Sequence, residues 1–137
     1  MTVRLYSSTS QQTTLTGAIT SGASSMVVQS GSALLGGQTV SSGETFTVVI
    51  DPDTALEEIV DVTAVSTNTF TITRGVESGG TGQNHSAGAV VRHMAIGRDF
   101  RDANRHAEAS ASYNDGGGSA VSLHGIASGE GVVVGTL

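Results

Sequence analysis

The stretch EEIVDVTAVSTNTFTITR, Glu57–Arg74, is the part of the sequence that decides the fold. Apolar and polar residues alternate along two arms, as in β-strands with one face in a core. Ser66-Thr67-Asn68 separates the arms and is expected to form the turn, in which Asn68 is able to adopt a positive φ. The segment therefore predicts a β-hairpin. The side chains predicted to face inward are Val60, Val62, Ala64, Phe70 and Ile72, and those predicted to face outward are Thr69, Thr71 and Thr73.

Similar alternation flanks the hairpin on both sides. Further strands are expected within Thr13–Ile19, Ser24–Gln29, Glu44–Ile50 and Gly88–Met94. Apolar residues make up 37% of the chain and aromatic residues 4%, below the usual apolar content of globular domains, and small polar residues and Gly fill the difference. We therefore predict a mainly β fold, either a β-sandwich or a small β-barrel, over residues 1–94.

Residues 95–113 change to a helical period. Ile96, Phe100, Ala103 and Ala107 recur at i, i+4, i+7 and i+11, which is the spacing of an apolar stripe along one face of an α-helix. The stripe is narrow and mostly Ala beyond Phe100. Such a stripe suits close packing against another helix, including the same helix of a second copy. These four residues are therefore predicted to form part of an assembly interface.

The C-terminal segment, 114–137, is rich in Gly and contains the apolar run Val132-Val133-Val134. A segment of this length and composition cannot form a core of its own. It is either disordered or adds a strand to a neighbouring chain, and the alternation of Gly with Val favours the second. We therefore predict an extended assembly tail, with the three valines as contact residues.

Charge and composition restrict the classes of partner. The net charge is −6 and the pI is about 4.9, so nucleic acid and membrane surfaces are not expected partners. The absence of Cys excludes disulfides, thiolate zinc sites and Cys nucleophiles. The first residues, MTVRLYSSTSQ, lack an apolar leader, so we expect a protein that is made in the cytoplasm and is not secreted.

The loop after the hairpin contains Arg74, Glu77 and His85, which invites two interpretations. In a functional interpretation, His85 is a general base beside two charged partners. In a structural interpretation, Arg74 pairs with Glu77 and His85 fixes the loop, while Gly75 and Gly88 allow the chain to turn. Because the sequence has no G-x-S-x-G elbow to supply a nucleophile, we favour the structural interpretation and assign no catalytic residue.

The sequence carries no recognised metal or cofactor motif. The four histidines are dispersed, with no H-x-x-x-H or H-E-x-x-H pair. The acidic turn from Asp51 to Glu58 lacks the ligand spacing of a calcium loop. The glycines from Gly129 to Gly135 have neither the Lys nor the following helix of a phosphate loop. We therefore expect no metal site and no cofactor.

Several of these stretches together resemble a module of small structural proteins of tailed bacteriophages. The stretches EEIVDVTAVSTNTFTITRG, HSAGAVVRHM and RDFRDANRHA are similar to minor tail proteins and to the N-terminal, virion-attaching domains of tail fibres. The family pattern is roughly E-x-[IV]-x-V, a turn, T-x-T-R-G, a Gly/Thr loop, H-x-x-G-x-x-V and R-D-[FL]. The matching positions are Glu58, Val60, Val62, Thr71, Thr73, Arg74, Gly75, His85, Gly88, Val91, Arg98, Asp99 and Phe100.

The resemblance implies a non-enzymatic virion protein that forms a homo-oligomer, with a trimer expected, and that contacts other virion proteins. Two placements are compatible with it. The resemblance favours the tail, as a minor tail protein or fibre base. The sequence ends at Leu137 without a fibre shaft, which favours the capsid surface, as a decoration protein. The alternative from another class is a ligand-binding or hydrolytic β-domain that uses the loop around His85.

Overall fold

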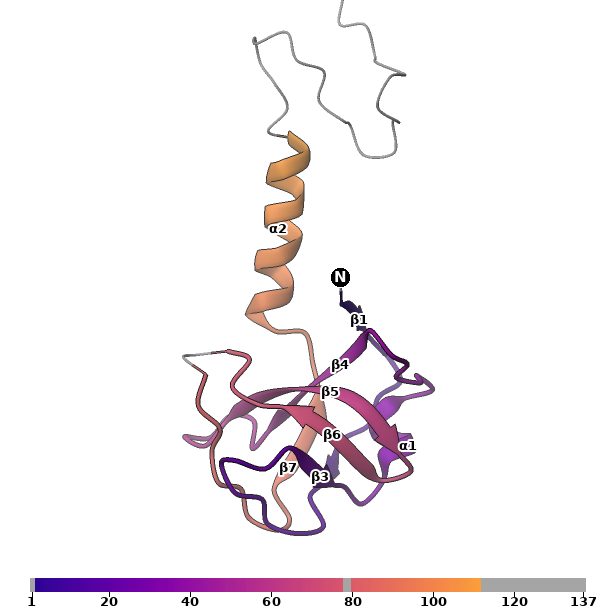
Figure 1. The fold of residues 1–137 in the computed structure, drawn as a ribbon, viewed down its shortest axis with the longest axis vertical. Helices are drawn as coiled ribbons and strands as arrows, with labels where there is room; N and C mark the ends of the chain where they lie inside the picture. Colours follow the sequence, from indigo (N-terminus) through magenta and orange to yellow (C-terminus); the bar gives the residue numbers. More distant parts are fainter. Residues whose placement is uncertain (1, 78–79, 112–137) are drawn as a thin grey trace, which may run out of the picture. The chain divides into compact units, whose positions relative to one another are not determined.

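Seven strands and two helices make up the part of the chain that the structure describes, residues 2–77 and 80–111 of a computed structural model (Figure 1). The chain divides into two compact units, Met1–Ala95 and Ile96–Leu137. The strands are β1 (Val3–Leu5), β2 (Thr13–Thr14), β3 (Ser25–Val27), β4 (Glu44–Ile50), β5 (Glu58–Ser66), β6 (Thr69–Thr73) and β7 (Val90–His93), and the helices are α1 (Gly31–Leu35) and α2 (Gly97–Ala111).

All seven strands belong to one curled sheet in the first unit. Its order is β2-β7-β4-β5-β6-β3, and β1 lies off this path on β4. The pairing of β1 with β4 is parallel, whereas the other pairings are antiparallel. Phe46 pairs with β5 on one side and with β1 on the other, so β1 and β7 share the second edge of β4. β4 is therefore the strand around which the sheet is organised.

The two ends of the sheet path are joined, which closes it into a small β-barrel. Just beyond β2 and β3, Leu15 and Val28 form an antiparallel bridge. On either side of it, the Thr16 N–H donates to the Val27 carbonyl and the Gln29 N–H donates to the Thr14 carbonyl, both at 2.9 Å. The prediction of a mainly β fold is confirmed, and the barrel is the form that it takes.

The predicted hairpin is β5 and β6, with Ser66 paired to Thr69 across a two-residue turn. Within this turn Thr67 has the positive φ, 55°, and Asn68, the residue that tolerates such a φ best, does not. The Asn68 side chain has another role. Its Oδ1 accepts a hydrogen bond of 2.8 Å from the Gly31 N–H at the start of α1. The turn residue therefore fixes a neighbouring helix in addition to reversing the chain.

Ala64 is exposed, contrary to the prediction that it would face inward. Val62 pairs with Ile72, but Ala64 pairs with Thr71, so β5 carries one extra residue at this point. Such a β-bulge shifts the alternation by one residue and moves the following side chains to the opposite face. As a result, Val65 packs against the core and Ala64 does not.

The core lies inside the barrel and follows the predicted alternation elsewhere. α1, which periodicity did not predict, contributes two leucines to it. Ser30 caps the start of this helix and Gly36, with φ 53°, ends it. The buried core residues are Leu15, Met26, Val28, Leu34, Leu35, Phe46, Val48, Ile50, Val60, Val62, Phe70, Ile72, Ala89 and Val91.

Helix α2, in the second unit, confirms the helix predicted within residues 95–113. Its start is fixed locally, because the Ile96 N–H donates to Asp99 Oδ2 at 2.9 Å and the Asp99 N–H donates to the Ile96 carbonyl at 3.0 Å. Phe100 is 64% exposed and Ala103 is also exposed, whereas Ile96 is buried. The Ala107 side chain and the predicted tail, 114–137, lie outside the described residues. Within the described part, no helix is long and apolar enough to cross a bilayer.

We predict that Phe70→Ala lowers the free energy of unfolding by about 3–5 kcal/mol, because the Phe70 ring is fully buried and its removal leaves a cavity. Urea unfolding followed by far-UV circular dichroism measures this loss. The control is Leu56→Ala, at a position that is 48% exposed, where a change below about 0.5 kcal/mol is expected. Equal losses in the two variants would contradict the assignment of Phe70 to the core.

Candidate functional site

A buried ion pair joins the two arms of the hairpin at its open end. Glu58 begins β5, and Arg74 directly follows β6. Arg74 Nε donates to Glu58 Oε1 at 2.8 Å, and Arg74 Nη2 donates to Glu58 Oε2, so the contact is bidentate. The two side chains are only 9% and 5% exposed. A planar guanidinium suits this fork-to-fork contact in a way that a Lys ammonium does not.

His85 extends the ion pair toward β4. Its Nε2 lies 3.0 Å from Glu58 Oε2, and its Nδ1 lies 2.8 Å from Asp51 Oδ2. The imidazole is completely buried, while the Asp51 side chain is 21% exposed. The backbone of His85 is also fixed, by reciprocal hydrogen bonds with Ile19 of 2.9 and 3.0 Å. We call the four side chains of Asp51, Glu58, Arg74 and His85 the ion cluster.

The ion cluster holds two loops as well as two strands. Arg74 Nη1 donates to the Thr20 carbonyl at 2.6 Å, and Arg74 Nη2 also donates to the Gln83 carbonyl. The Gln83 N–H donates to Glu58 Oε2 at 2.7 Å. Nearby, the Ser21 N–H donates to Asn84 Oδ1 at 2.7 Å. The loop before β3 and the loop before β7 are therefore tied to the same two charged side chains.

Hydrogen bonding determines the charge of Glu58. Burial raises the pKa of its carboxyl, but hydrogen bonds from Arg74, the Gln83 backbone and His85, together with the positive charge of Arg74, outweigh that effect. The result is a pKa lowered from 4.5 to about 2. Glu58 is thus a carboxylate across the ordinary pH range, and it acts as the common acceptor of the cluster.

The geometry suits structural support better than catalysis. Both ring nitrogens of His85 face carboxylate oxygens, which only accept hydrogen bonds, so the imidazolium form can donate to both partners. In that form, two cations face two carboxylates and the cluster is electrically balanced. Neither nitrogen is directed at a space where a substrate could bind, because the ring has no exposed surface. A general base must reach the proton that it removes.

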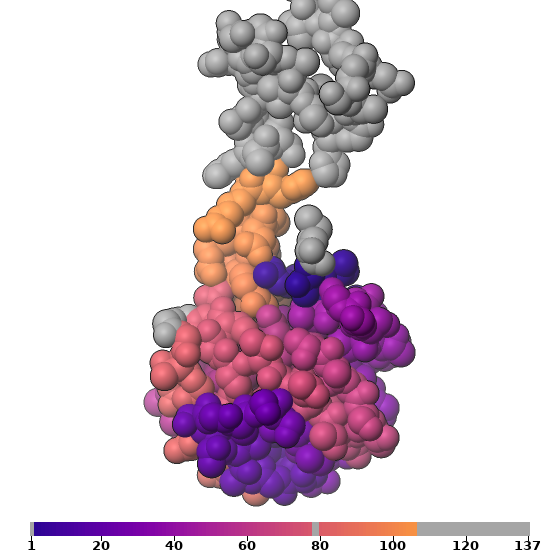
Figure 2. All heavy atoms as spheres, in the orientation of Figure 1, coloured from indigo at the N-terminus to yellow at the C-terminus, as the bar shows by residue number. Residues whose placement is uncertain are grey.

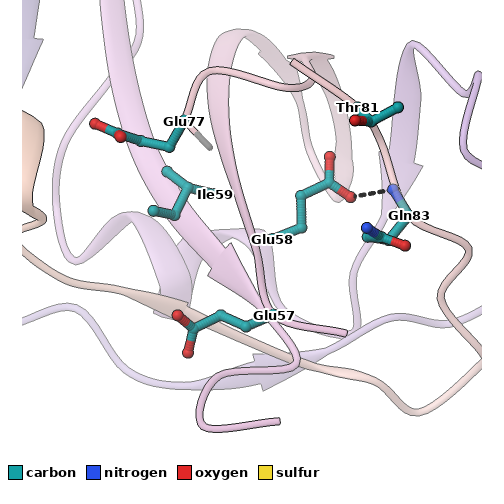
Figure 3. A pocket seen from close by; sticks show the side chains of 6 residues that line it. All are labelled: Glu57, Glu58, Ile59, Glu77, Thr81 and Gln83. Atoms are coloured by element: carbon teal, nitrogen blue, oxygen red, sulfur yellow. Dashed lines mark hydrogen bonds between the residues drawn. The ribbon is translucent and has the colours of Figure 1, made fainter. Parts of the chain in front are cut away.

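The structure brings two of the predicted loop residues together, Arg74 and His85, but the carboxylate between them is Glu58. Glu77 instead lines a shallow polar hollow, and Figure 3 shows its carboxylate directed away from that of Glu58. The Glu58 carboxylate accepts from the Gln83 N–H, the hydrogen bond drawn as a dashed line in Figure 3. The residues lining the hollow are Glu57, Glu58, Ile59, Glu77, Thr81 and Gln83.

The two predicted loop glycines both have positive φ values, 63° at Gly75 and 85° at Gly88. Gly75 is also restricted by space, since a Cβ there would lie 2.4 Å from the backbone of Gly80. The Gly80 backbone therefore leaves no room for a side chain at position 75. The prediction that this loop has to bend sharply at glycine is therefore consistent with its conformation.

Sequence reasoning missed both carboxylate partners of His85, Glu58 and Asp51. Asp51 and Asp53, in the acidic turn before β5, adopt positive φ values of 51° and 63°. Non-glycine residues adopt this conformation at some cost, which Asp and Asn tolerate best. Among the described residues, no group of three or more His, Asp or Glu side chains is arranged to hold a metal ion.

Comparison with known proteins does not assign the chain to a family. No protein-family model matches the sequence, and no curated protein matches it significantly. The residues and their arrangement are therefore the basis for the proposed function.

We predict that Glu58→Gln lowers the free energy of unfolding by about 3 kcal/mol at pH 6, because the pKa of Glu58 falls by about 2.5 units on folding and each unit corresponds to about 1.36 kcal/mol. A carboxyl with a depressed pKa stabilises the fold above its unfolded pKa of 4.5, and this contribution is lost as the pH falls toward 2. The difference between wild type and variant should therefore shrink over that interval. Urea unfolding at a series of pH values measures it.

The matched control is Glu57→Gln, one residue earlier, where the carboxylate is exposed. Its Oε2 accepts from the Asp53 N–H at 2.7 Å, a hydrogen bond that the Gln amide oxygen can retain. A change below about 0.5 kcal/mol is expected at pH 6. A loss in Glu58→Gln that stays constant with pH would contradict the role assigned to its charge.

Proposed function

We propose that the chain is a non-enzymatic structural component of a tailed-phage virion, located in the tail as a minor tail protein or fibre base. In this proposal, the barrel is the rigid body of each subunit, and α2 makes contacts between subunits in a homo-oligomer, with a trimer as the expected symmetry. Its further partners are other virion proteins. The chain itself is made in the host cytoplasm and becomes part of the particle.

The observation that carries the proposal is the meeting of three motif residues in one place. Glu58, Arg74 and His85 are spread along the stretches that resemble phage tail modules, and they form a single buried contact network. Motif residues that contact one another in the interior stabilise the fold. The shared motif therefore supports a relation to proteins with the same fold, and it gives His85 a structural role in place of a catalytic one.

The alternative of a ligand-binding or hydrolytic domain is less well supported by the same geometry. Its candidate base, His85, has both nitrogens in contact with carboxylates and no exposed surface. Arg74 is likewise occupied by Glu58 and by two backbone carbonyls. A binding role would have to use other groups than these.

Helix α2 supports the assembly part of the proposal. Phe100 and Ala103 are exposed although both belong to the apolar stripe. The 4-3-4 spacing from Ile96 to Ala107 is the a/d repeat with which helices pack in bundles. Burial of Phe100 against a second copy of the helix would remove a large apolar surface from water. This is the contact that a homo-oligomer would supply.

The copy number of the chain in purified particles tests the placement. Quantitative mass spectrometry against the major capsid protein should give one copy per many tens of capsid subunits if the chain belongs to the tail. A ratio near one to one, or one to a few, would overturn the tail placement in favour of a capsid decoration protein. Absence from the particle would overturn the virion proposal altogether.

We predict that Phe100→Ala weakens self-association by roughly 10- to 100-fold, the equivalent of about 1.5–3 kcal/mol for burying one large apolar side chain. Sedimentation velocity over a range of protein concentrations measures the shift, and circular dichroism verifies that the fold is retained. Arg105→Ala, at an exposed position on the opposite side of the helix, is the control and should associate like wild type. A Phe100→Ala variant that associates like wild type would contradict assembly through α2.

A further inference from the structure

The imidazole of His93 lies where three segments of the barrel meet. His93 is the last residue of β7, and its ring stacks on Phe46 of β4 with the ring centroids 4.0 Å apart and the planes 20° from parallel. The ring of Tyr6, just beyond β1, is tilted against it at a centroid distance of 6.1 Å. Two hydrogen bonds, to Thr47 and to Ser7, complete its surroundings.

The partners of the two nitrogens fix the protonation of this ring. The Thr47 carbonyl can only accept, so Nδ1, 2.7 Å away, carries a proton and donates it. The Ser7 backbone N–H can only donate, so Nε2, 3.2 Å away, accepts with its lone pair. The contacts therefore require the neutral tautomer with its proton on Nδ1. This arrangement is the opposite of that at His85, where both partners accept.

The segment that His93 holds is short and lies at the surface. β1 has three residues, and its N-terminal end is held by a hydrogen bond of 3.0 Å from the Val3 N–H to the Gly43 carbonyl. Val3 is 52% exposed and Tyr6 is 49% exposed, and Leu5 packs against the core. Figure 2 shows this N-terminal stretch, in indigo, on the outside of the first unit. Beyond it, the Ser7 hydroxyl donates to the Gly36 carbonyl at 2.8 Å.

We propose that His93 is a proton-sensitive latch for the N-terminal strand. A second proton on the ring occupies Nε2, which places an N–H against the Ser7 N–H. The hydrogen bond is lost and two donors then face each other, so β1 separates from β4 up to the anchor formed by the Ser7 side chain. Release uncovers the edge of β4 from Glu44 to Phe46, where backbone groups become available to another strand.

A second ring N–H finds no carboxylate acceptor among the groups that contact the imidazole in the described part of the chain. Among the described residues, the groups in direct contact with the imidazole are Tyr6, Ser7, Phe46 and Thr47, of which Tyr6 alone is titratable. The strands around the ring also carry charged groups, namely Arg4 on β1 opposite Thr45, Asp61 on β5 opposite Thr47, and Arg92 on β7 opposite Val49. Asp61 on β5 accepts from the Thr47 hydroxyl at 2.7 Å, and Arg92 on β7 donates to Gln12 at 2.9 Å.

Amide hydrogen exchange between pH 7.5 and 5.0, corrected for the intrinsic rate at each pH, tests the latch. Protection at Leu5 and Ser7 should fall by at least tenfold toward pH 5, while protection of the β5–β6 amides stays constant. The ¹⁵N shifts of the His93 ring, followed in the same samples, show when the ring gains its second proton, and the loss of protection should accompany that change.

Two substitutions at the same position separate the latch from a general effect of acid. His93→Gln places a non-titrating amide oxygen near the position of Nε2, so protection at Ser7 should persist at all pH values. His93→Asn is too short to supply that acceptor, so protection should be low even at pH 7.5. His106→Gln, an exposed position on α2, is the control and should behave like wild type.

Three outcomes would overturn the proposal. One is wild-type protection at Ser7 that does not change while the ring titrates. The second is an equal loss in wild type and His93→Gln. The third is a simultaneous loss of protection in β1 and in the β5–β6 hairpin, which would mean that acid unfolds the whole barrel.

Discussion

The buried carboxylate of Glu58 is the constraint on which the rest of the barrel depends. A charge removed from water is costly unless charged and polar partners surround it. Here Arg74, His85 and the Gln83 backbone supply those partners, and they come from the end of one strand and from a single long loop. The ion cluster therefore specifies where the irregular loops go, a task that apolar packing alone performs poorly.

The apolar core and the ion cluster have complementary roles. The core stabilises the closed sheet through nondirectional burial, and many arrangements of similar side chains would fill it. The ion cluster is directional, since each hydrogen bond requires one partner at one angle. The bridge between Leu15 and Val28 closes the barrel. Arg74 holds the loop between these two residues through its hydrogen bond to the Thr20 carbonyl. Together they turn a curled sheet into a single closed body.

Much of the fold was predictable because its signals are local. Alternation located the hairpin and the strands around Phe46 and Val91, and the i, i+4 spacing located α2. The bulge that exposes Ala64 was not predictable, because it depends on pairing with Thr71. At the candidate site, Arg74 and His85 stood out by residue type. Their partner Glu58 did not stand out, because Glu77 lies nearer to both residues in the sequence. Glu58 comes close only when β5 pairs with β6, which is a tertiary effect.

The pairing of β2 with β7 has a consequence for synthesis of the protein. Thr13 emerges from the ribosome early, whereas its partner Val91 emerges only after nearly all of the barrel sequence. Contacts between such distant positions form late, because a long loop must close before they contribute stability. The β5–β6 hairpin, whose arms are adjacent in sequence, is complete well before that. The nascent chain therefore leaves the ribosome first as an open sheet. In that form β2 is unpaired, and Glu58 and Arg74 do not yet have His85 as a neighbour.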